Sequence, residues 1–376
     1  MLKSIRLVNF YSFRDTTIEL NRGVNVLVGI NGSGKSNFFK VFELLQEAFN
    51  GRGLRRYILE TGGINEILYQ GERENDEIII ELEFTKPYFD LQNLANLWSS
   101  SFFYRLTIKE NQKEYSLIEK AWFGDTDVFL SQNGSQEPLI KQKFFQNEID
   151  DNLEFGGLKA FLDPNSLKLY MQFDTRVEAK IRKPNLSIPE KTLSSDGSNL
   201  TQVLNTIKVN NKKTYRKIIA ALKNVNPHFK DFDFRPFGTN FEMLLEEEGL
   251  NRSIHLSKVS DGTLRYLCFI AILLNVEGGE FIGIDEPETG LHPDMLYNLA
   301  EAIKEAGETS TVVISTHSTQ LLNYFDLETV RVFEKDADNS TQVYAYTEGD
   351  FKGWYDTFQV GTMWRQGDIG GNRYGN

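Results

Sequence analysis

Apolar runs broken by short polar turns mark the beginning of the chain and predict strands there. Residues 2–20 hold alternating apolar positions on both sides of a polar turn at 11–15, which predicts two strands. Residues 23–28 are almost continuously apolar, as expected of a buried strand. Residues 37–45 then carry apolar side chains at helical spacing. The predicted order is therefore two strands, a buried strand and a helix.

Three β-rich segments follow and predict an antiparallel sheet. They are residues 77–84, 102–108 and 115–123. Residues 125–165 are polar with scattered aromatic side chains, and we expect loops and short helices there. Residues 167–173 predict one more strand, and the prolines within 183–189 predict an extended boundary segment.

Helical patterns and short apolar runs share the second half of the chain. Helical spacing occurs at 199–209, 214–222 and 266–275. Residues 280–286 and 311–318 are apolar runs that end in polar side chains. If these runs are parallel strands, their polar ends lie at the carboxyl edge of the sheet. Segments at 330–333 and 342–346 flank a polar turn and predict a β-hairpin.

Residues 29–36 (GINGSGKS) match the phosphate-binding pattern G-x-x-x-x-G-K-[ST] at every specified position. Glycines let backbone N–H groups close around phosphate oxygens, Lys35 brings a positive charge, and the Ser36 hydroxyl can bind Mg²⁺. The predicted strand before this phosphate loop and the helix after it supply the required context. The residues expected to bind the nucleotide here are Gly29, Asn31, Gly32, Ser33, Gly34, Lys35, Ser36 and Asn37.

Two acids and a histidine follow the two apolar runs of the second half. Asp285 would support Mg²⁺, and Glu286 would orient and deprotonate the attacking water. The alternative for this pair is an acidic turn after a strand. His317 would bond the γ-phosphate or hold the glutamate, although a histidine at a strand end is often structural. Their combination with the phosphate loop favours the catalytic interpretation.

Two further positions have both a functional and an ordinary explanation. Ser260 and Gly262 precede an apolar helix, where a hydroxyl, N–H groups and the helix dipole suit an anion. An ordinary helix cap at Ser260 or Asp261 explains the same pattern. Arg14, in the turn at 11–15, either contacts an adenine or phosphate or is a solvated turn residue.

Composition narrows the class of protein. The 376 residues contain no apolar run long enough to cross a membrane and no signal-peptide pattern. The single cysteine, Cys268, excludes a disulfide framework and a cysteine zinc site, so we expect a cytoplasmic protein without a membrane partner. The net charge of −12 opposes overall attraction to DNA, so any nucleic-acid contact must be local.

One basic segment departs from this acidic background. No Asp or Glu lies between residues 197 and 230. The cations there are Lys208, Lys212, Lys213, Arg216, Lys217, Lys223 and Lys230. Either they form a solvated helical face, or they form a patch that meets nucleic-acid phosphate or an acidic partner.

The order of these motifs resembles that of ATP-binding-cassette (ABC) ATPases, within the branch that holds RecF, the SMC-type heads and the OLD-type ATPases. The resemblance rests on residues 5–13, 31–37, 260–263 (SDGT), 285–293 (DEPETGLHP) and 315–318 (STHS). It covers roughly residues 1–85 and 250–335, and the middle of the chain matches nothing so firmly.

The resemblance implies an α/β fold: an ABC-ATPase head with a mixed or parallel core sheet, an antiparallel β lobe and a helical insertion lobe. We expect an N-terminal ATPase lobe at 1–190, a helical insertion with the basic segment at 191–250, and a C-terminal ATPase lobe at 251–376. It also implies ATP and Mg²⁺ as cofactors and a homodimer that sandwiches ATP. In that dimer, Ser260 and Gly262 of one copy would face Lys35, Ser36, Asp285, Glu286 and His317 of the other.

The chain also departs from the family pattern. The transporter-type signature Leu-Ser-Gly-Gly is replaced by VSDG at 259–262, as is common in this branch. The Q-loop glutamine is either Gln70 or Gln132. No long coiled coil is present in the sequence, so an SMC-type tether is not expected.

The C-terminal region bears on the effector. OLD-type nucleases carry a Toprim domain after the histidine, and Glu334, Asp336 and Asp338 faintly resemble its acidic ligands. Only 59 residues follow His317, so we expect a hairpin and no nuclease here. Residues 361–371 resemble the tail of short ATPases of this branch, which are often encoded beside a separate Toprim-like or other nuclease partner, several of them in phage defence.

These features favour an ATPase that dimerises on ATP and switches a DNA-associated or defence complex through a separate effector such as a nuclease. The alternative within the branch is a RecF-like DNA repair ATPase. A transporter subunit is disfavoured by the signature and by the lack of a clear Q-loop. A scaffold that binds ATP without hydrolysis is disfavoured by Glu286.

Overall fold

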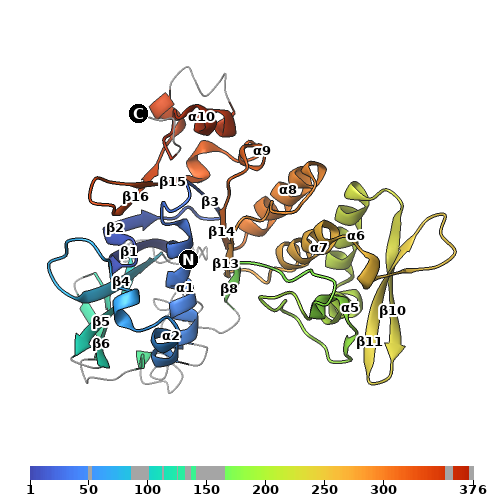
Figure 1. Cartoon of the computed structure of the whole chain (residues 1–376), viewed down its shortest axis with the longest axis horizontal. Helices are drawn as coiled ribbons and strands as arrows, with labels where there is room; N and C mark the ends of the chain where they lie inside the picture. The colour runs from blue at the N-terminus through green and yellow to red at the C-terminus, as the bar shows by residue number, and fades with distance from the viewer. Residues whose placement is uncertain are drawn as a thin grey trace, which may run out of the picture.

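Six strands drawn from both halves of the chain form the core sheet of the computed structural model (Figure 1). Their order is β16 (Thr341–Ala345), β15 (Val330–Lys335), β3 (Val24–Val28), β14 (Thr311–Ser315), β13 (Phe281–Ile284) and β8 (Leu167–Tyr170). The strands from β15 to β8 run parallel, whereas β16 pairs antiparallel with β15. Every residue of β3, β13 and β14 is buried, which explains their uninterrupted apolar character.

The structure describes residues 1–49, 53–85, 101–111, 114–124, 126–131, 137–140, 166–351 and 359–371. Within these ranges no helix is long and apolar enough to cross a membrane.

A second, antiparallel sheet is built almost entirely from the first third of the chain. Its order is β2 (Phe13–Glu19), β1 (Leu2–Phe10), β4 (Glu77–Phe84), β5 (Phe102–Asn111), β6 (Glu114–Phe123) and β7 (Thr126–Ser131). The predicted strands at 2–20, 77–84, 102–108 and 115–123 are thereby confirmed. Strand β7 corrects the expectation of loops and short helices at its position, and residues 141–165 lie outside the described residues.

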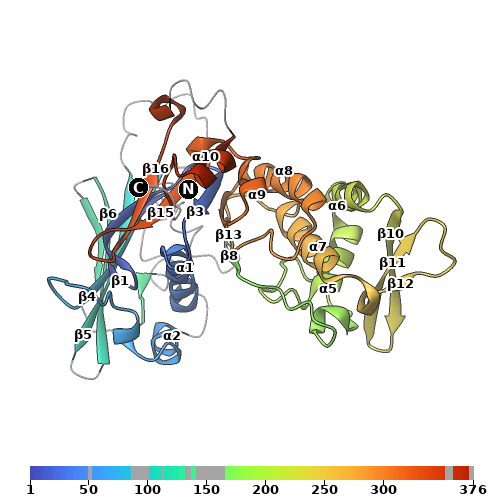
Figure 2. The ribbon, with the colours of Figure 1, turned by 45° about the horizontal axis from the view of Figure 1, so that its top comes forward.

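Helix α1 (Lys35–Phe49) joins the two sheets. The Phe42 ring stacks on Phe281 of β13 with centroids 4.0 Å apart, and the Phe49 ring meets Tyr104 of β5 at 5.9 Å. Figures 1 and 2 both show α1 between the antiparallel sheet and the core sheet. The short helix α2 (Leu54–Glu60) packs beside α1. Because α1 is buried against both sheets, its first turn has a fixed position at the end of β3.

Four helices and a small sheet form a third part of the molecule, at the opposite end from the antiparallel sheet (Figures 1 and 2). The helices are α5 (Leu200–Asn210), α6 (Lys212–Val225), α7 (Asp261–Leu273) and α8 (Leu296–Gly307). The sheet contains β10 (Phe229–Phe237), β11 (Asn240–Glu247), β12 (Ile254–His255) and β9 (Asn185–Leu186). Helices α5, α6 and α7 were expected from their apolar spacing, whereas α8 was not predicted, and the sheet adds a β component to the expected helical insertion.

Short elements complete the C-terminal side. The β15–β16 hairpin confirms the prediction for 330–346. Helices α9 (Thr319–Leu322) and α10 (Val360–Gln366) pack together, and the Trp364 indole N–H donates to the Gly371 carbonyl at 3.2 Å. The fold agrees with an ABC-ATPase head that has a mixed core sheet, an antiparallel β lobe and a helical lobe.

Candidate nucleotide site

The phosphate loop lies between β3 and α1, as its sequence context requires. Asn31, Gly32 and Ser36 are exposed, whereas Ser33 and Lys35 are buried. The Ser33 hydroxyl has no hydrogen-bond partner among the described residues. An exposed loop of N–H groups at a helix start, with a buried unpaired hydroxyl and a buried cation, fits a phosphate chain.

Lys35 is held inside the loop by the loop's own backbone. Its Nζ donates to the Gly29 carbonyl at 2.7 Å and to the Ile30 carbonyl at 3.3 Å. Burial lowers the pKa of Lys35 to about 8, although the charges of Asp285 and Glu286 act in the opposite direction. The ammonium group is therefore poorly solvated and has two acidic side chains nearby, a setting in which an added polyanion restores the charged form.

Two residues far apart in sequence support the back of the loop. Thr341 Oγ1 lies 2.8 Å from both the Ser33 carbonyl oxygen and Ser12 Oγ. A Cβ at Gly34, whose φ is +112°, would lie 2.3 Å from Thr341 Oγ1. The Asn37 amide donates to Ser12 Oγ at 2.9 Å. Sequence analysis assigned no role to Ser12 or Thr341, and no local pattern reveals a contact between residues this far apart.

Asp285 and Glu286 follow β13 at the carboxyl edge of the core sheet. The Ser315 hydroxyl, at the end of the neighbouring β14, donates to Asp285 Oδ1 and accepts from the Glu286 N–H at 3.1 Å. Burial is the main cause of the raised pKa of Asp285, and the Glu286 charge adds to it. The parallel register of β13 and β14 thus brings Ser315 beside the predicted metal ligand and the predicted base.

Glu286 and His317 meet directly. His317 Nε2 lies 3.4 Å from Glu286 Oε1, and the Thr289 hydroxyl donates to Glu286 Oε2 at 3.2 Å. Glu286 has a φ of +46°, an uncommon backbone conformation for a residue with a side chain. Burial lowers the pKa of His317, and the Lys35 charge acts in the same direction. The imidazole is therefore biased towards its neutral form beside the carboxylate.

Glu288 is a residue of this site that sequence analysis left without a role. Its Oε1 accepts from the Thr316 hydroxyl at 2.7 Å, the His317 N–H at 2.9 Å and the Ser318 N–H at 3.2 Å. Its Oε2 is buried and has no partner among the described residues, and burial raises the pKa of this carboxyl. Glu288 thus ties the loop after β13 to the loop after β14. The sequence feature that could have pointed to Glu288 is its position in the acidic segment at 285–293.

A cavity of about 290 Å³ opens beside the two acids and is also lined by Gln172. Gln172 follows β8, which pairs in parallel with β13. Gln70 instead donates to the carbonyls of Asn65 and Leu68 in its own loop, and Gln132 lies outside the described residues. Gln172, which sequence analysis did not consider for the Q-loop, therefore lies beside the predicted metal ligand and the predicted base. It lay inside the predicted strand at 167–173, which in the structure ends at Tyr170 as β8.

Ser260 and Gly262 lie at the start of α7. They are distant in sequence from the ends of the core strands, but Gly262 lies against the loop after β13. The Ser260 hydroxyl caps the helix, accepting from the Thr263 N–H at 3.1 Å. A Cβ at Gly262 would lie 2.7 Å from the Gly290 carbonyl oxygen, so only glycine fits without a shift. The Arg265 guanidinium donates to the Thr289 carbonyl at 2.9 Å. The cap that the sequence allowed is present, and Ser260 remains exposed.

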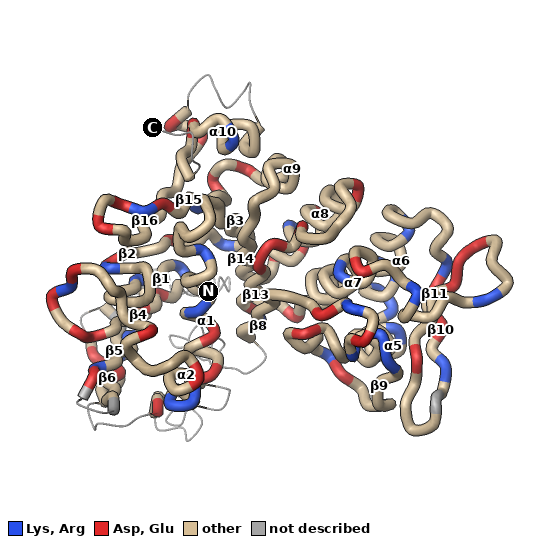
Figure 3. The backbone as a smooth tube through the Cα atoms, viewed as in Figure 1, with Lys and Arg blue, Asp and Glu red and all other residues tan. Residues whose placement is uncertain are grey.

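The basic segment is less uniform than its sequence indicates. Acids from other elements pair with three of its seven cations: Lys208 with Asp231, Lys217 with Glu305, and Lys230 with Glu246. Figure 3 shows the cations and acids interspersed around α5, α6, β10 and β11. The expectation of a segment without a balancing acid is thus wrong for these three. The exposed cations left without an ion pair to a described residue are Lys212, Lys213, Arg216 and Lys223.

Two acidic positions near the C-terminus serve the hairpin turn. Asp336 accepts from the N–H groups of Asp338 and Ser340 at 3.0 and 2.8 Å, and Asp338 pairs with Arg14 at 3.2 Å. Glu334 accepts from the Gly371 N–H. Among the described residues, no group of three acids, histidines or cysteines is placed to hold a metal ion. The hairpin explains these acids, and Arg14 has an acidic partner in the turn.

Comparison with known proteins supports the same classification of the fold. The chain is 15% identical to an SMC head bound to the C-winged helix domain of ScpA, with a TM-score of 0.60 over 93% of this chain and 99% of that one. The SMC head domain from Thermotoga maritima is 16% identical, with a TM-score of 0.51 over 92% of this chain and 99% of that one.

Relatives found by sequence are also nucleotide-dependent proteins by name. An ATP/GTP phosphatase of Helicobacter pylori is 23% identical over 373 residues, covering 93% of each chain. The Rad50 ATPase of double-strand break repair from Methanococcus maripaludis is 32% identical over 84 residues, which are 22% of this chain and 7% of that protein. The second match is thus confined to a small part of a much longer relative.

A family model described as "AAA domain, putative AbiEii toxin, Type IV TA system" matches residues 24–323. This range runs from β3, before the phosphate loop, to the end of α9, and it contains Lys35, Asp285, Glu286 and His317. The chain therefore belongs to this AAA-domain family and has the fold of an ABC/SMC-like ATPase.

Proposed function

We propose that the protein binds and hydrolyses ATP and uses it to switch between a monomer and a dimer that controls a separate effector. The observation that carries the hydrolytic part is the contact between His317 Nε2 and Glu286 Oε1, 3.4 Å apart, beside the buried Lys35. A glutamate held by a histidine at the edge of a phosphate site has the position of a general base.

The roles of the side chains follow from their surroundings. Lys35 supplies positive charge to the phosphates, and the loop N–H groups bind their oxygens. Ser36 and Asp285 would hold Mg²⁺, which neutralises phosphate charge when bound. Glu286 accepts the proton of the attacking water, and His317 orients that carboxylate. Thr289 holds the second oxygen of Glu286, so both oxygens of the base have a defined place.

Dimerisation is proposed because Ser260 of the signature is exposed. Ser260 and its helix start are available at the surface, while Gly262 packs against Gly290 of its own chain. An exposed helix start, with the positive end of its dipole at the surface, suits the phosphate of a second copy. ATP bound in one copy would then be completed by Ser260 and Gly262 of the other.

A direct test uses two substitutions at the site. Glu286→Gln keeps the shape of the side chain but cannot accept the proton, so phosphate release should fall by about 10² to 10⁴ while ATP binding persists. Lys35→Ala should lose ATP binding itself, because the phosphates lose their cation. Turnover by the Glu286 variant equal to that of the parent would show that this residue is not the base.

The effector and nucleic-acid parts of the proposal rest on relatives and on charge. Family members are described as putative AbiEii toxins, and one relative is named for double-strand break repair, so defence and DNA repair are the two settings considered. An SMC head is named as bound to ScpA, a separate protein. Copurification with the product of the neighbouring gene, followed by sizing with and without ATP, tests whether this ATPase has such a partner.

A further inference from the structure

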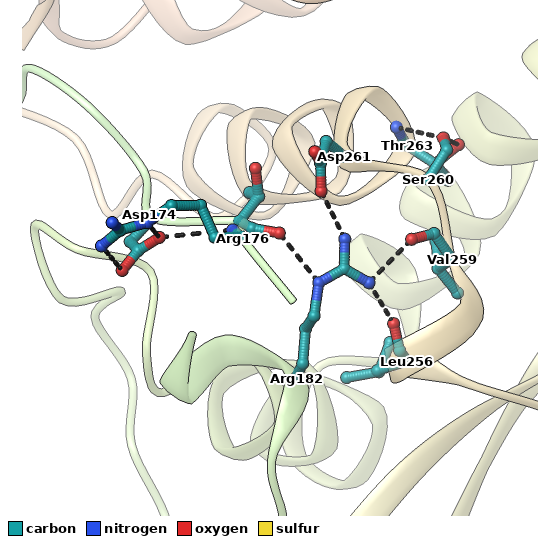
Figure 4. Close-up of polar contacts among 9 residues, drawn as sticks. Asp174, Arg176, Arg182, Leu256, Val259, Ser260, Asp261 and Thr263 are labelled. Carbon is teal, nitrogen blue, oxygen red and sulfur yellow. Dashed lines mark hydrogen bonds and ion pairs between the residues drawn. The ribbon is translucent and has the colours of Figure 1, made fainter. Parts of the chain in front are cut away.

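Arg182 is a buried arginine that holds the signature loop, defined here as residues 256–262. It ends the short helix η3 (Lys180–Arg182), and only 4% of its side chain is exposed. Its Nη1 donates to the carbonyls of Leu256 and Val259 at 2.6 and 2.7 Å, and its Nη2 donates to Asp261 Oδ1 at 2.5 Å. Figure 4 shows the guanidinium pointing into the loop, with Ser260 beyond it at the helix start.

The two residues on either side of Ser260 are therefore bonded to one guanidinium. The carbonyl of Val259 and the carboxylate of Asp261 both accept from Arg182. Ser260 is also held from its other side, because its hydroxyl caps α7 through Thr263. The direction of the exposed Ser260 side chain thus depends on where Arg182 lies.

The remaining guanidinium nitrogen of Arg182 contacts the segment that follows β8 of the core sheet. Its Nε donates to the Thr175 carbonyl at 2.8 Å, and Thr175 itself is buried. This segment begins directly after β8, whose Tyr170 carbonyl accepts from the Asp285 N–H at 3.1 Å. Gln172 lies within it and lines the cavity beside Asp285. One short stretch of chain therefore runs from the acids of the nucleotide site to the arginine that holds the signature loop.

The bonding of Arg182 makes its position hard to replace. A buried guanidinium is stable only when its N–H groups are paired, and here three of its four partners are neutral carbonyls. Asp261 is 62% exposed, so the ion pair itself is screened by solvent and contributes little. Removal of Arg182 would take a donor from the carbonyls of Thr175, Leu256 and Val259, of which Leu256 keeps the Val259 N–H at 3.2 Å.

We propose that Arg182 is a positioning residue that sets the signature loop for contact with the nucleotide of a second copy. It couples the segment after β8, which borders one nucleotide site, to Ser260, which completes another. This role rests on the proposed ATP-dependent dimer. It predicts that loss of the guanidinium geometry weakens assembly while leaving nucleotide binding within one copy unchanged.

Arg176 offers a matched control in the same segment. It pairs with Asp174 at 2.9 Å, but the arginine side chain is 86% exposed, and its guanidinium bonds only to Asp174 among the described residues (Figure 4). Arg176→Ala removes a positive charge six residues before Arg182 and disturbs no side-chain contact to the signature loop. Arg182→Lys keeps the charge but lacks the fork that reaches Leu256, Val259 and Asp261 together.

The experiment compares Arg182→Lys, Arg182→Ala and Arg176→Ala in a Glu286→Gln background that retains ATP. Three quantities are measured with Mg-ATP: affinity for the nucleotide at low protein concentration, dimer dissociation constant by light scattering, and hydrogen exchange of residues 256–262 without nucleotide. The thermal midpoint identifies a variant that does not fold, in which case Arg182→Lys carries the test.

The expected result for Arg182→Lys is a dimer at least tenfold weaker, faster exchange in the signature loop and nucleotide affinity within twofold of the parent, with Arg176→Ala like the parent. Unchanged dimerisation in both Arg182 variants beside a dimerising parent would overturn the role of Arg182 alone. An equal loss of nucleotide affinity would also overturn it, by showing general damage. A parent that stays monomeric with ATP would overturn the proposed dimer and, with it, this role.

Discussion

Glu288 Oε1 accepts a hydrogen bond from the backbone N–H of His317 at 2.9 Å, so one carboxylate fixes the start of the loop that carries the histidine. The same oxygen accepts from Thr316 and Ser318, which lie on either side of His317. Its second oxygen is buried without a partner among the described residues. The contact between the His317 and Glu286 side chains therefore depends on a third residue, Glu288, which bonds the backbone N–H of His317 and not its imidazole.

Glu288→Ala should lower the rate of ATP hydrolysis by about tenfold or more, equal to roughly 1.4 kcal/mol in the barrier, because His317 loses its backbone support. ATP binding should persist, since Lys35 and the phosphate loop are unaltered. Glu288→Gln is the matched control, because an amide oxygen still accepts from the same three donors. Steady-state phosphate release checks both, and equal loss in the two variants would contradict the argument.

Ser260→Arg should block ATP-dependent assembly and spare nucleotide binding. The exposed hydroxyl would be replaced by a bulky cation at the surface proposed to meet the second copy. Light scattering with ATP measures the mass, and equilibrium binding at low protein concentration measures the affinity. If parent and variant have the same mass with ATP, the composite site is wrong.

ATP affinity should fall as the pH rises above about 8. Burial lowers the pKa of Lys35 to about 8 in the nucleotide-free protein, so the side chain is mostly a neutral amine above that pH. Bound phosphates favour the charged form, so binding at higher pH must take up a proton, and each further pH unit costs affinity. Below pH 8 Lys35 is already charged, and this contribution should level off.

Calorimetric titration at pH 8.5 in two buffers of different ionisation enthalpy measures that proton uptake. The buffer must release each proton that the complex takes up. The measured binding enthalpy should therefore be more positive in the buffer with the larger ionisation enthalpy. Equal heats would mean that Lys35 is already protonated in the free protein at this pH.

Replacing Lys212, Lys213 and Arg216 with glutamine should weaken DNA binding in a low-salt shift assay. Each is exposed and has no ion pair to a described residue, so its charge is available to phosphate. Raising the salt from about 50 to 200 mM should weaken the parent steeply and the variant less, because fewer counterions are released.

The matched control changes the same number of charges elsewhere, at lysines that are paired on the surface. These are Lys109, Lys120 and Lys304, with Glu77, Asp127 and Glu301 as partners. Such exposed pairs contribute about 0–1 kcal/mol each, so the control should fold and bind DNA like the parent. If both triple variants bind equally, the α6 cations are a solvated face.

The catalytic strands were predictable because their signals are local. Strands β3, β13 and β14 are buried on both faces and so carry continuous apolar runs that end in polar residues. Gln172 was overlooked because the predicted strand at 167–173 extended over it, whereas β8 ends at Tyr170. The register between β13 and β14 then brings Asp285 and Ser315 together without any pattern that names the pair.

The supports of the site had no such signal. Arg182 and Thr341 act on residues more than 70 and 300 positions away, and the sequence contains no periodicity that joins them. The free positive charge of the basic segment was overestimated for the same reason. Glu305, which pairs with Lys217, lies on α8, a different element of the fold. Charge counted along the sequence therefore overestimates charge available at a surface.

The contact between Thr341 and Ser33 also has a consequence for biosynthesis. During translation the phosphate loop leaves the ribosome long before β16 exists, so the nascent loop has no support behind it and no β14 beside β3. Parallel pairing between such distant strands is slow to form. The phosphate loop would therefore lack both its Thr341 contact and its β14 neighbour until late in synthesis, and premature termination before Thr341 would yield fragments whose phosphate loop stays without this support.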